Sequence, residues 1–365
     1  MKYLKYIPIR SIISGFFIIS LLSANESNAQ PASNKWLLAL SKADHVLAII
    51  DPVSLKTVAR VPVGSDPHEV IASSDGKTAY VTIYGGGSLH ELNVIDLVAQ
   101  KPLNDIDTRP LFGPHGITFV NNKVWFTAEG SKAIGRYDPA TGKLDWSMGT
   151  GQDRTHMIYV STNGKRIYTT NVSSGTVSIL VDTLIQPGGM APPPGMKAPA
   201  NMQQPPKGNP PPGFGPHEDW TQTIVPTARG SEGFDVSPDS SELWTASSED
   251  GMISVIDVKA KTVKTKIDAK AQGANRLKFT PDGKQVFISS LSQSDLIVFD
   301  ATTHQEVKRL RIGHGAAGIL MDTDGSRAYV ACTPDNYIAV IDLKKLEVIN
   351  HIDIGGPDGL AWALQ

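Results

Sequence analysis

A short hydrophobic run that ends in aspartate recurs seven times along the chain of 365 residues, and it limits the possible folds more than any other feature. Successive aspartates stand 42 to 45 residues apart, except for one step of 75 residues. A period of about 40–45 residues is typical of β-propeller blades. We therefore predict an all-β chain of repeated blades with one long insertion. The seven aspartates are Asp51, Asp96, Asp138, Asp182, Asp257, Asp300 and Asp342.

Each period has the same internal order. A turn sequence such as TPDGK (280–284) supplies the positive φ that a tight hairpin needs, and alternating β-branched and aromatic residues follow it. The segment 35–64 holds three strands without an inner one, and the chain ends just after a seventh inner strand. We therefore predict a seven-bladed β-propeller of four-stranded antiparallel blades, with the ring closed by N-terminal strands that join the C-terminal inner strand.

Two segments do not follow the repeat. Residues 1–29 have a basic start, an apolar run (12–24) and a small-residue cleavage site, SNA, which together predict a cleaved signal peptide. We expect residues 30–365 to form a periplasmic or secreted propeller with no transmembrane segment after cleavage. Residues 184–220 are rich in Pro, Gly and Met and cannot build a packed core. We predict that they are an insertion between the third and fourth strands of blade three.

Charge and cysteine content disfavour other classes of protein. Removing the leader, which has three basic residues and one acidic residue, takes the formal net charge from −2 to −4. That charge argues against nucleic-acid binding driven by net charge. Cys332 is the only cysteine, so no internal disulfide can form, and the stability must come from core packing. We expect a monomer.

The sequence AYVT (79–82) resembles the YVTN-repeat β-propeller family, the YncE-like secreted propellers. The spacing of the VID, Gly, Pro and SPDG-like elements along the chain resembles the same family. The resemblance covers nearly the whole mature chain and implies the seven-bladed fold. It implies no single function, because propellers host many activities. A shorter resemblance, PHGI (114–117), is to the streptogramin lyase-like propellers, and it implies lyase chemistry by His and Glu side chains at the channel mouth.

Aligning the inner strands places one residue of each blade at the same structural position beside the central channel. We predict that six of these seven residues bind a ligand at the channel mouth. The first four also offer the nitrogen and oxygen ligands that Zn²⁺, Fe²⁺ or Cu²⁺ accept, so a divalent transition metal stays open as an alternative to a polar, hydrated lining. The predicted ligand-binding residues are His68, His115, His156, Glu232, Asn275 and Asp358, and the seventh position is Ala317.

Other polar residues are expected on the same face. The loops after the second strands of the blades reach that face, and two of them contribute Tyr84 and Glu129. The Pro-rich insertion should leave from the opposite face. Glu69, Arg154 and Arg276 flank the aligned positions, and we interpret them as surface charges, the usual role of such residues. The alternatives are that Glu69 and Arg154 tune the pKa values of the cluster or bind an anion, and that Arg276 faces the channel wall.

Two classes of function stay open at this point. A binding module would recognise a small molecule, polymer or protein at the channel mouth without turnover. An enzyme would use a bound metal, or His115 and Glu232 as an acid–base pair, for a lyase or lactonase reaction. Nucleic-acid binding is a third and weaker alternative, because the mature chain is mildly acidic.

Overall fold

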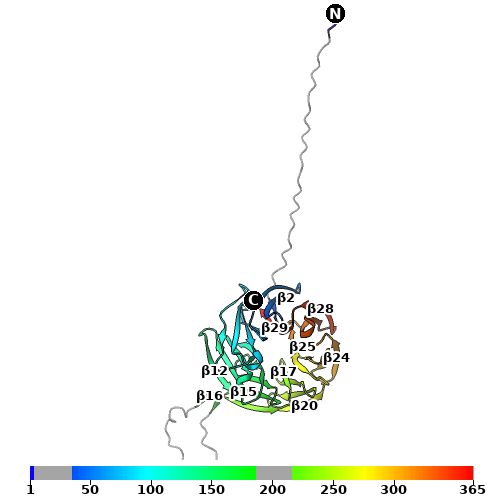
Figure 1. Ribbon diagram of the computed structural model, residues 1–365. Coiled ribbons are helices and arrows are strands. Elements are labelled where there is room, and N and C mark those ends of the chain that lie inside the picture. The colour runs from blue at the N-terminus through cyan, green and yellow to red at the C-terminus, as the bar shows by residue number, and fades with distance from the viewer. Residues whose placement is uncertain (4–34, 186–215, 365) are drawn as a thin grey trace, which may run out of the picture. The chain divides into compact units, whose positions relative to one another are not determined.

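The computed structural model describes residues 1–3, 35–185 and 216–364. The predicted signal peptide, apart from its first three residues, and most of the Pro-rich insertion lie outside the described residues. Contacts divide the chain into Met1–Ala32 and Ser33–Gln365, and the second unit is the propeller. Its seven antiparallel sheets form a ring around a central channel, as predicted (Figure 1).

Blades one to four run from β4 to β20, and the first strand of each blade is the innermost. Blade one contains β4 (Pro67–Ala72), β5 (Thr78–Ile83), β6 (Glu91–Asp96) and two short outer strands, β7 (Lys101–Pro102) and β8 (Ile106–Asp107). Blade two contains β9 (Pro114–Val120), β10 (Lys123–Ala128), β11 (Ala133–Asp138) and β12 (Lys143–Gly149). Blade three contains β13 (Thr155–Val160), β14 (Arg166–Asn171), β15 (Thr176–Ile185) and β16 (His217–Pro226). Blade four contains β17 (Ser231–Val236), β18 (Glu242–Ser247), β19 (Met252–Asp257) and β20 (Thr262–Asp268).

The remaining three blades complete the ring. Blade five contains β21 (Ala274–Phe279), β22 (Gln285–Ser290), β23 (Asp295–Asp300) and β24 (Glu306–Arg311). Blade six contains β25 (Ala316–Met321), β26 (Arg327–Cys332), β27 (Tyr337–Asp342) and β28 (Glu347–Asp353). Blade seven contains β29 (Pro357–Leu364), β1 (Lys35–Ser41), β2 (Val46–Asp51) and β3 (Lys56–Pro62). The only helices in the described residues are three short 3₁₀ turns: η1 (Gly85–Gly87), η2 (Glu129–Ser131) and η3 (Thr333–Asp335).

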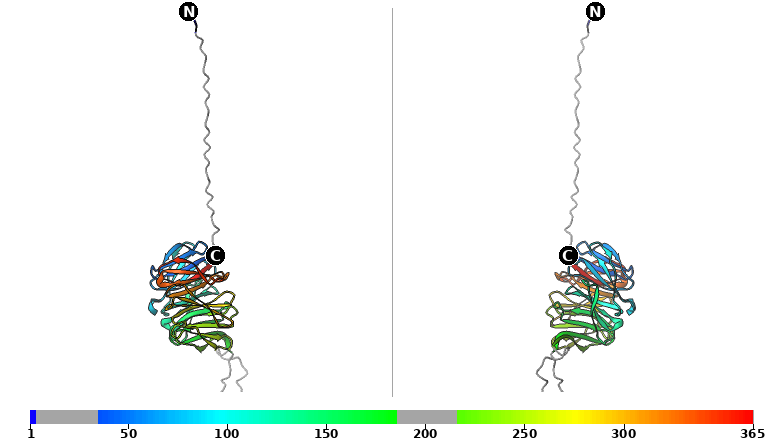
Figure 2. Two further views of the ribbon diagram at one scale, coloured as in Figure 1. Left: turned by 90° about the vertical axis from the view of Figure 1, so that its right-hand side faces the viewer. Right: turned by 90° about the vertical axis from the view of Figure 1, so that its left-hand side faces the viewer.

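The closure of the ring is confirmed. The C-terminal strand β29 pairs antiparallel with β1, from Lys35 opposite Leu364 to Ala39 opposite Leu360. Figure 2 shows the blue N-terminal strands beside the red C-terminal segment, while the green blades lie across the ring. This pairing joins sequence-distant strands into one four-stranded blade, so β1 is hydrogen-bonded on both sides.

Hydroxyl side chains of the second strands join neighbouring inner strands. Thr82 of blade one donates a hydrogen bond to the carbonyl of His115 in blade two, and Thr127 of blade two does the same to His156 in blade three. Ser289 of blade five repeats the contact with Ala317 of blade six. The threonine of the YVT sequence is therefore an architectural residue, because its hydroxyl satisfies a buried carbonyl of the next blade.

Glycine follows the aligned channel residue in blades two, four, six and seven, where inner strands approach closely. A Cβ atom on Gly318 would lie 2.2 Å from the carbonyl oxygen of Asp358, and one on Gly359 would lie 2.4 Å from that of His68. No side chain fits at those distances. In the other three blades the same position carries Glu69, Met157 or Arg276.

The strands that flank the Pro-rich segment are longer than expected. β15 and β16 pair from Thr176 opposite Pro226 to Ile185 opposite His217. The hairpin therefore includes residues at both ends of the predicted 184–220 insertion. Because Thr176 lies at the same end of the blade as Thr155, the far end of this hairpin is at the opposite end of the blade from His156. No helix among the described residues is long and apolar enough to span a membrane.

Candidate functional site

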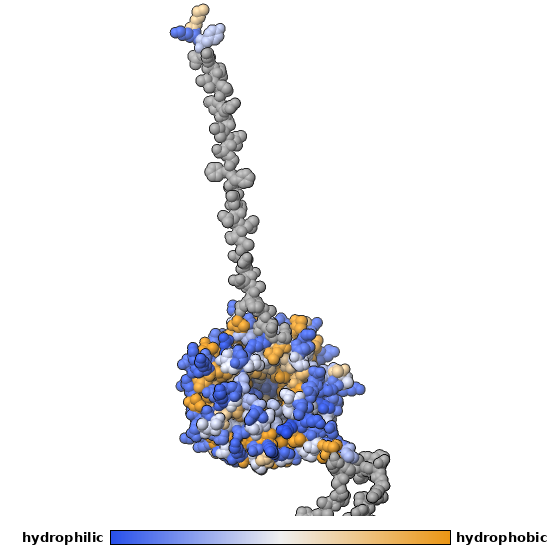
Figure 3. Space-filling view, turned by 180° about the vertical axis from the view of Figure 1, so that it is seen from behind, coloured by the Kyte–Doolittle hydropathy of each residue, from blue (hydrophilic) through white to orange (hydrophobic). Residues whose placement is uncertain are grey.

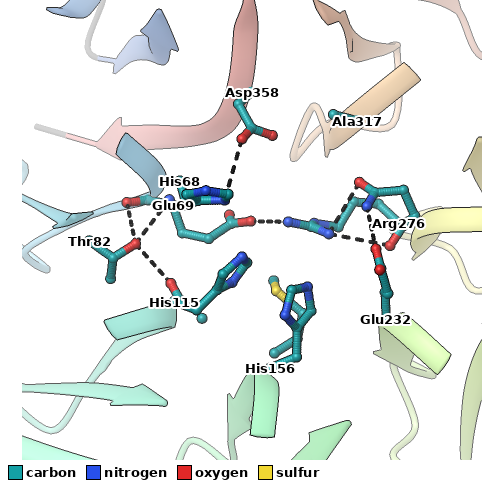
Figure 4. Close-up of polar contacts among 12 residues, drawn as sticks. His68, Glu69, Thr82, His115, His156, Glu232, Arg276, Ala317 and Asp358 are labelled. Atoms are coloured by element: carbon teal, nitrogen blue, oxygen red, sulfur yellow. Dashed lines mark hydrogen bonds and ion pairs between the residues drawn. The ribbon is translucent and has the colours of Figure 1, made fainter. Parts of the chain in front are cut away.

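The seven aligned residues occupy the second position of the seven inner strands, as the repeat predicted. Three consecutive blades place imidazole rings side by side at this position. The ring centroids of His68 and His115 are 4.6 Å apart, and those of His115 and His156 are 3.9 Å apart (Figure 4). We call these three residues the histidine arc. The other four positions, Glu232, Asn275, Ala317 and Asp358, form the carboxylate arc.

His156 is held by a carboxylate from the neighbouring blade. Its Nδ1 atom forms a hydrogen bond with Oε1 of Glu129, the first residue of η2 directly after β10. Tyr84, which follows β5, donates its hydroxyl to the other carboxylate oxygen of Glu129. The side chains of His156 and Glu129 are only 4% and 3% exposed, whereas Nε2 of His156 is buried without a hydrogen-bond partner. The arrangement leaves one imidazole nitrogen of His156 buried and without a hydrogen-bond partner.

His115 lies between the other two histidines and is kept neutral. Its side chain is buried, and its Nδ1 atom has no partner in the described structure. Burial lowers the pKa of His115 well below its usual value, and the neighbouring His156 and His68 lower it further. A neutral imidazole keeps one hydrogen-bond donor and one acceptor, so His115 adds a polar group without charge to the channel.

His68 belongs to a network of charges on the closing blade. Its Nε2 atom lies 2.8 Å from Nζ of Lys42 and 3.0 Å from Oδ1 of Asp66. Lys42 also forms a 3.2 Å ion pair with Asp358. The hydrogen bond with His68 holds the pKa of Asp66 below its usual range despite the opposing effect of burial. Both hydrogen-bonding edges of His68 are thus near charged groups.

A buried ion pair crosses the channel beside the histidine arc. Arg276 of blade five donates a hydrogen bond from Nη2 to Oε1 of Glu69 in blade one (Figure 4). Its Nη1 atom donates to both the backbone and the side-chain oxygen of Asn275, and Asn275 in turn donates to Glu232 at 2.7 Å. Burial opposes the charge on Arg276, but Glu69, Asp358 and Glu232 outweigh it and raise the pKa of the guanidinium.

These side chains surround a cavity of about 430 Å³ at the channel mouth. Its size falls within the range of roughly 300–1,000 Å³ that is usual for small-molecule sites. Three cations line it, and the space-filling view from behind shows the hollow at the centre of the ring (Figure 3). The lining residues are Lys42, His68, Arg154, His156, Glu232, Asn275, Arg276, Leu291, Gly315, Ala317, Thr333, Pro334 and Asp358.

Several expectations about this site need correction. Arg276 and Glu69 are not surface charges, since their side chains are 7% and 13% exposed and paired with each other. Arg154 is 43% exposed, but it lies at the cavity rim, 3.6 Å from Glu129 and 4.0 Å from Glu232. The sequence placed Glu129 and Tyr84 on the correct face without indicating their contact with His156.

The expected metal-ligand set is not formed. Across residues 35–185 and 216–364, no group of three or more His, Cys, Asp or Glu side chains is arranged to hold a metal ion. The reason lies in the contacts: His156 turns its Nδ1 atom to Glu129, and Glu232 is occupied by Asn275 and Arg154. His68 is engaged by Lys42 instead. The residues of the predicted set therefore do not fit a resident metal ion.

The fold defines the chain as a seven-bladed β-propeller with a polar cavity at the channel mouth. The model of the cytochrome D1 heme domain family matches residues 208–323, about a third of the chain. The chain resembles a putative 6-phosphogluconolactonase from Bacteroides fragilis, with a TM-score of 0.68, 13% identity, and coverage of 91% of this chain and 99% of the other. No curated protein sequence gives a significant match.

Two further solved structures share the fold. Hydrazine synthase from Kuenenia stuttgartiensis gives a TM-score of 0.62 at 14% identity and covers 81% of this chain and 89% of the other. Dihydro-heme d1 dehydrogenase NirN, solved in complex with DHE, gives a TM-score of 0.59 at 15% identity and covers 87% of this chain and 63% of the other. At such identities the likeness concerns the fold alone.

A haem, for which the matching family is named, requires apolar contact with its macrocycle and an axial ligand for its iron. Nε2 of His156 is an imidazole nitrogen without a partner. The apolar side chains that line the cavity are only Leu291, Ala317 and Pro334, and most of the others are charged or polar. The described residues of this cavity therefore do not fit a haem.

Proposed function

We propose that this chain is a secreted or periplasmic propeller of the YVTN-repeat type that binds a small polar ligand at the channel mouth. The observation that carries the proposal is the Nε2 atom of His156, which is buried and unpartnered in a side chain that lines the cavity. A buried polar atom without a hydrogen bond costs about 1–3 kcal/mol. A ligand that bonds to this nitrogen removes that cost, whereas an architectural role for His156 leaves it in place.

The lining favours a ligand with a negatively charged group. Lys42, Arg154 and Arg276 bring three cations to one cavity. Arg276 is already bound to Glu69, and Lys42 is paired with Asp66 and Asp358, so the more exposed Arg154 is the cation that a ligand reaches most easily from solvent. Hydroxyl groups on the ligand match the carboxylates of Glu232 and Asp358, which have further lone pairs beside their contacts with Asn275 and Lys42. The proposed ligand class is a small hydroxylated anion, which fits the cavity better than a polymer or a protein.

Isothermal titration calorimetry with gluconate, citrate and inorganic phosphate tests this proposal. We expect at least one of these anions to bind the wild type, and His156→Ala to weaken that binding at least tenfold in a variant that still unfolds cooperatively. The matched control is His351→Ala, since His351 is exposed on the outer strand β28. Equal affinity in the wild type and His156→Ala, or no binding of any of the three anions, contradicts the proposal.

A second candidate is a lyase or lactonase that works without a resident metal. The hydrogen bond between Glu129 and His156 favours it, because a carboxylate that orients an imidazole is a common arrangement for acid–base catalysis. Screening γ- and δ-lactones in the presence of a metal chelator tests this candidate. Turnover that persists with the chelator and disappears in His156→Ala supports an enzyme, whereas the absence of turnover across the lactone panel contradicts the lactonase form.

A further inference from the structure

We infer that His156 is a general base, whose Nε2 atom takes a proton from a hydroxyl group or water molecule held in the cavity, and that Glu129 and Tyr84 are its positioning residues. This inference rests on the proposed function, because it requires a ligand in the same cavity. It adds a direction of proton transfer to the ligand class already proposed. It also assigns roles to Glu129 and Tyr84, which neither the repeat nor the cavity explains.

The tautomer of His156 follows from its one hydrogen bond. An ionised carboxylate only accepts hydrogen bonds, so the Nδ1 atom that contacts Glu129 must carry the hydrogen. In a neutral imidazole the other nitrogen then has a free lone pair. That nitrogen, Nε2, is the atom that the protein leaves buried and without a partner. The contact with Glu129 therefore makes Nε2 of His156 a proton acceptor.

The charge on Glu129 is maintained although the residue is buried. Burial alone raises the pKa of a carboxyl group, but hydrogen bonds from His156 and Tyr84 outweigh it, and the pKa of Glu129 is lowered. Burial and the same carboxylate raise the pKa of the Tyr84 hydroxyl. The tyrosine therefore keeps its proton and donates a hydrogen bond to Glu129. Tyr84 and His156 both donate to Glu129, so the direction of both hydrogen bonds to this carboxylate is fixed.

The proposed step moves one proton and is not redox. The O–H bond of the ligand or water breaks, its electron pair stays on oxygen, and the proton forms a new N–H bond at Nε2 of His156. The resulting imidazolium is balanced by the carboxylate of Glu129. The resulting oxyanion lies in a cavity lined by Arg154 and Arg276, whose positive charges favour it. Different protein groups thus stabilise the two products of the transfer: Glu129 the imidazolium, and the two arginines the oxyanion.

Several charged or titratable groups face His156 or share its cavity. Among the described residues, Glu129 is the one that forms a direct hydrogen bond with the ring. His115 stacks beside it at a centroid distance of 3.9 Å and stays neutral through burial. The groups that face it or share its cavity are Lys42, His68, Tyr84, His115, Glu129, Arg154, Glu232, Arg276 and Asp358.

Nitrogen-15 NMR of the histidine-labelled mature protein tests the inference directly, without a ligand. We expect the His156 signal, assigned by its loss in His156→Gln, to show a protonated Nδ1 atom and an unprotonated Nε2 atom above neutral pH. Tyr84→Phe should keep this tautomer, because Glu129 still accepts from Nδ1. An Nε2-protonated tautomer in the wild type overturns the inference, and it does so even if Glu129 variants fail to fold.

A second measurement follows the proton transfer itself with 4-nitrophenol, whose ionised form absorbs visible light. Added below neutral pH, the phenol should show the phenolate band when it binds the wild type and His351→Ala. The band should be absent in His156→Ala and reduced at least threefold in Glu129→Gln, since the amide cannot balance an imidazolium. Phenol that binds the wild type without the band, or an unchanged band in His156→Ala, counts against the base.

The two proposals fail separately. If an anion binds and His156→Ala weakens that binding, but NMR shows hydrogen on Nε2 of His156, the binding proposal stands and the general base is wrong. If NMR shows the expected tautomer but no anion binds, the base geometry stands and the anion class is wrong.

Discussion

The histidine arc and the carboxylate arc use the same strand position for different purposes. In blades one to three the aligned residues contact each other through their rings, and two of these rings keep an unpartnered nitrogen. In blades four, five and seven the aligned residues are engaged in hydrogen bonds and ion pairs. The backbone register therefore places a side chain at the channel but does not determine its role. That role depends on which charged side chains of the neighbouring loops and strands contact it, as Glu129 contacts His156 and Lys42 contacts Asp358.

The largest effect is expected from breaking the ion pair that connects the two arcs. Arg276→Met leaves Glu69 buried without its partner, and the loss of one partner of a buried ion pair typically costs about 3–5 kcal/mol. Urea unfolding monitored by tryptophan fluorescence measures this loss. The matched control Arg311→Met removes an exposed arginine and should change the free energy of unfolding by less than about 0.5 kcal/mol.

A double variant, Glu69→Leu with Arg276→Met, sharpens the comparison. Replacing both charges by apolar groups removes the unpaired carboxylate, so much of the stability lost in Arg276→Met should return. A double variant no more stable than the single one would show that the pair contributes through packing or through the bonds from Arg276 to Asn275, not through the charge of Glu69.

An intermediate effect is expected at the glycines that let neighbouring inner strands approach closely, here within the carboxylate arc. Gly318→Ala would place a Cβ atom 2.2 Å from the carbonyl oxygen of Asp358, so the inner strands of blades six and seven must move apart. Overpacking of this kind typically costs about 1–3 kcal/mol. Gly149→Ala is the control, since its Cβ would meet no atom within 4 Å and its φ is not positive. Equal melting temperatures of the two variants would contradict the close approach of these strands.

The blades and the aligned positions could be predicted from the sequence because both follow from a repeat. Seven copies of one strand pattern give the register of His68, His115 and Glu232 without any structure. The ion pair between Glu69 and Arg276 could not be predicted, because its partners are 207 residues apart and meet only across the channel. Their contact depends on the channel width and on the direction of each side chain, and the period contains neither.

The metal set that the sequence left open is not formed among the described residues, for a related reason. Identical positions in consecutive blades bring three imidazoles together, and the sequence alone gives no sign of what the second nitrogen of each ring contacts. Glu129 was visible only as an acidic residue in a loop on the correct face. A carboxylate one blade before a channel histidine, directly after the second strand, is the signal that would have indicated the contact with His156.

The smallest effect concerns the pH dependence that the histidine arc alone should show. His115 is buried and its pKa is lowered in the folded protein, whereas the unfolded chain has an ordinary histidine with a pKa of about 6.5. Below that pH the unfolded state binds a proton that the folded state does not, so stability falls as the pH falls. The slope for one such group is at most about 1.4 kcal/mol per pH unit. Above about pH 6.5 the contribution is complete.

His115→Leu removes this titration and places an apolar side chain of similar size in the buried position. The free energy of unfolding of the variant should therefore decrease less than that of the wild type between pH 7.5 and pH 5, by up to about 1.4 kcal/mol per pH unit. Urea unfolding at both pH values measures the difference. His351→Leu, on the exposed outer strand, should follow the wild type. If the His115 variant keeps the full pH dependence, the acid sensitivity originates elsewhere, and His115 accepts a proton in the folded channel. A protonated His115 would remove the contrast between a neutral histidine arc and a charged carboxylate arc.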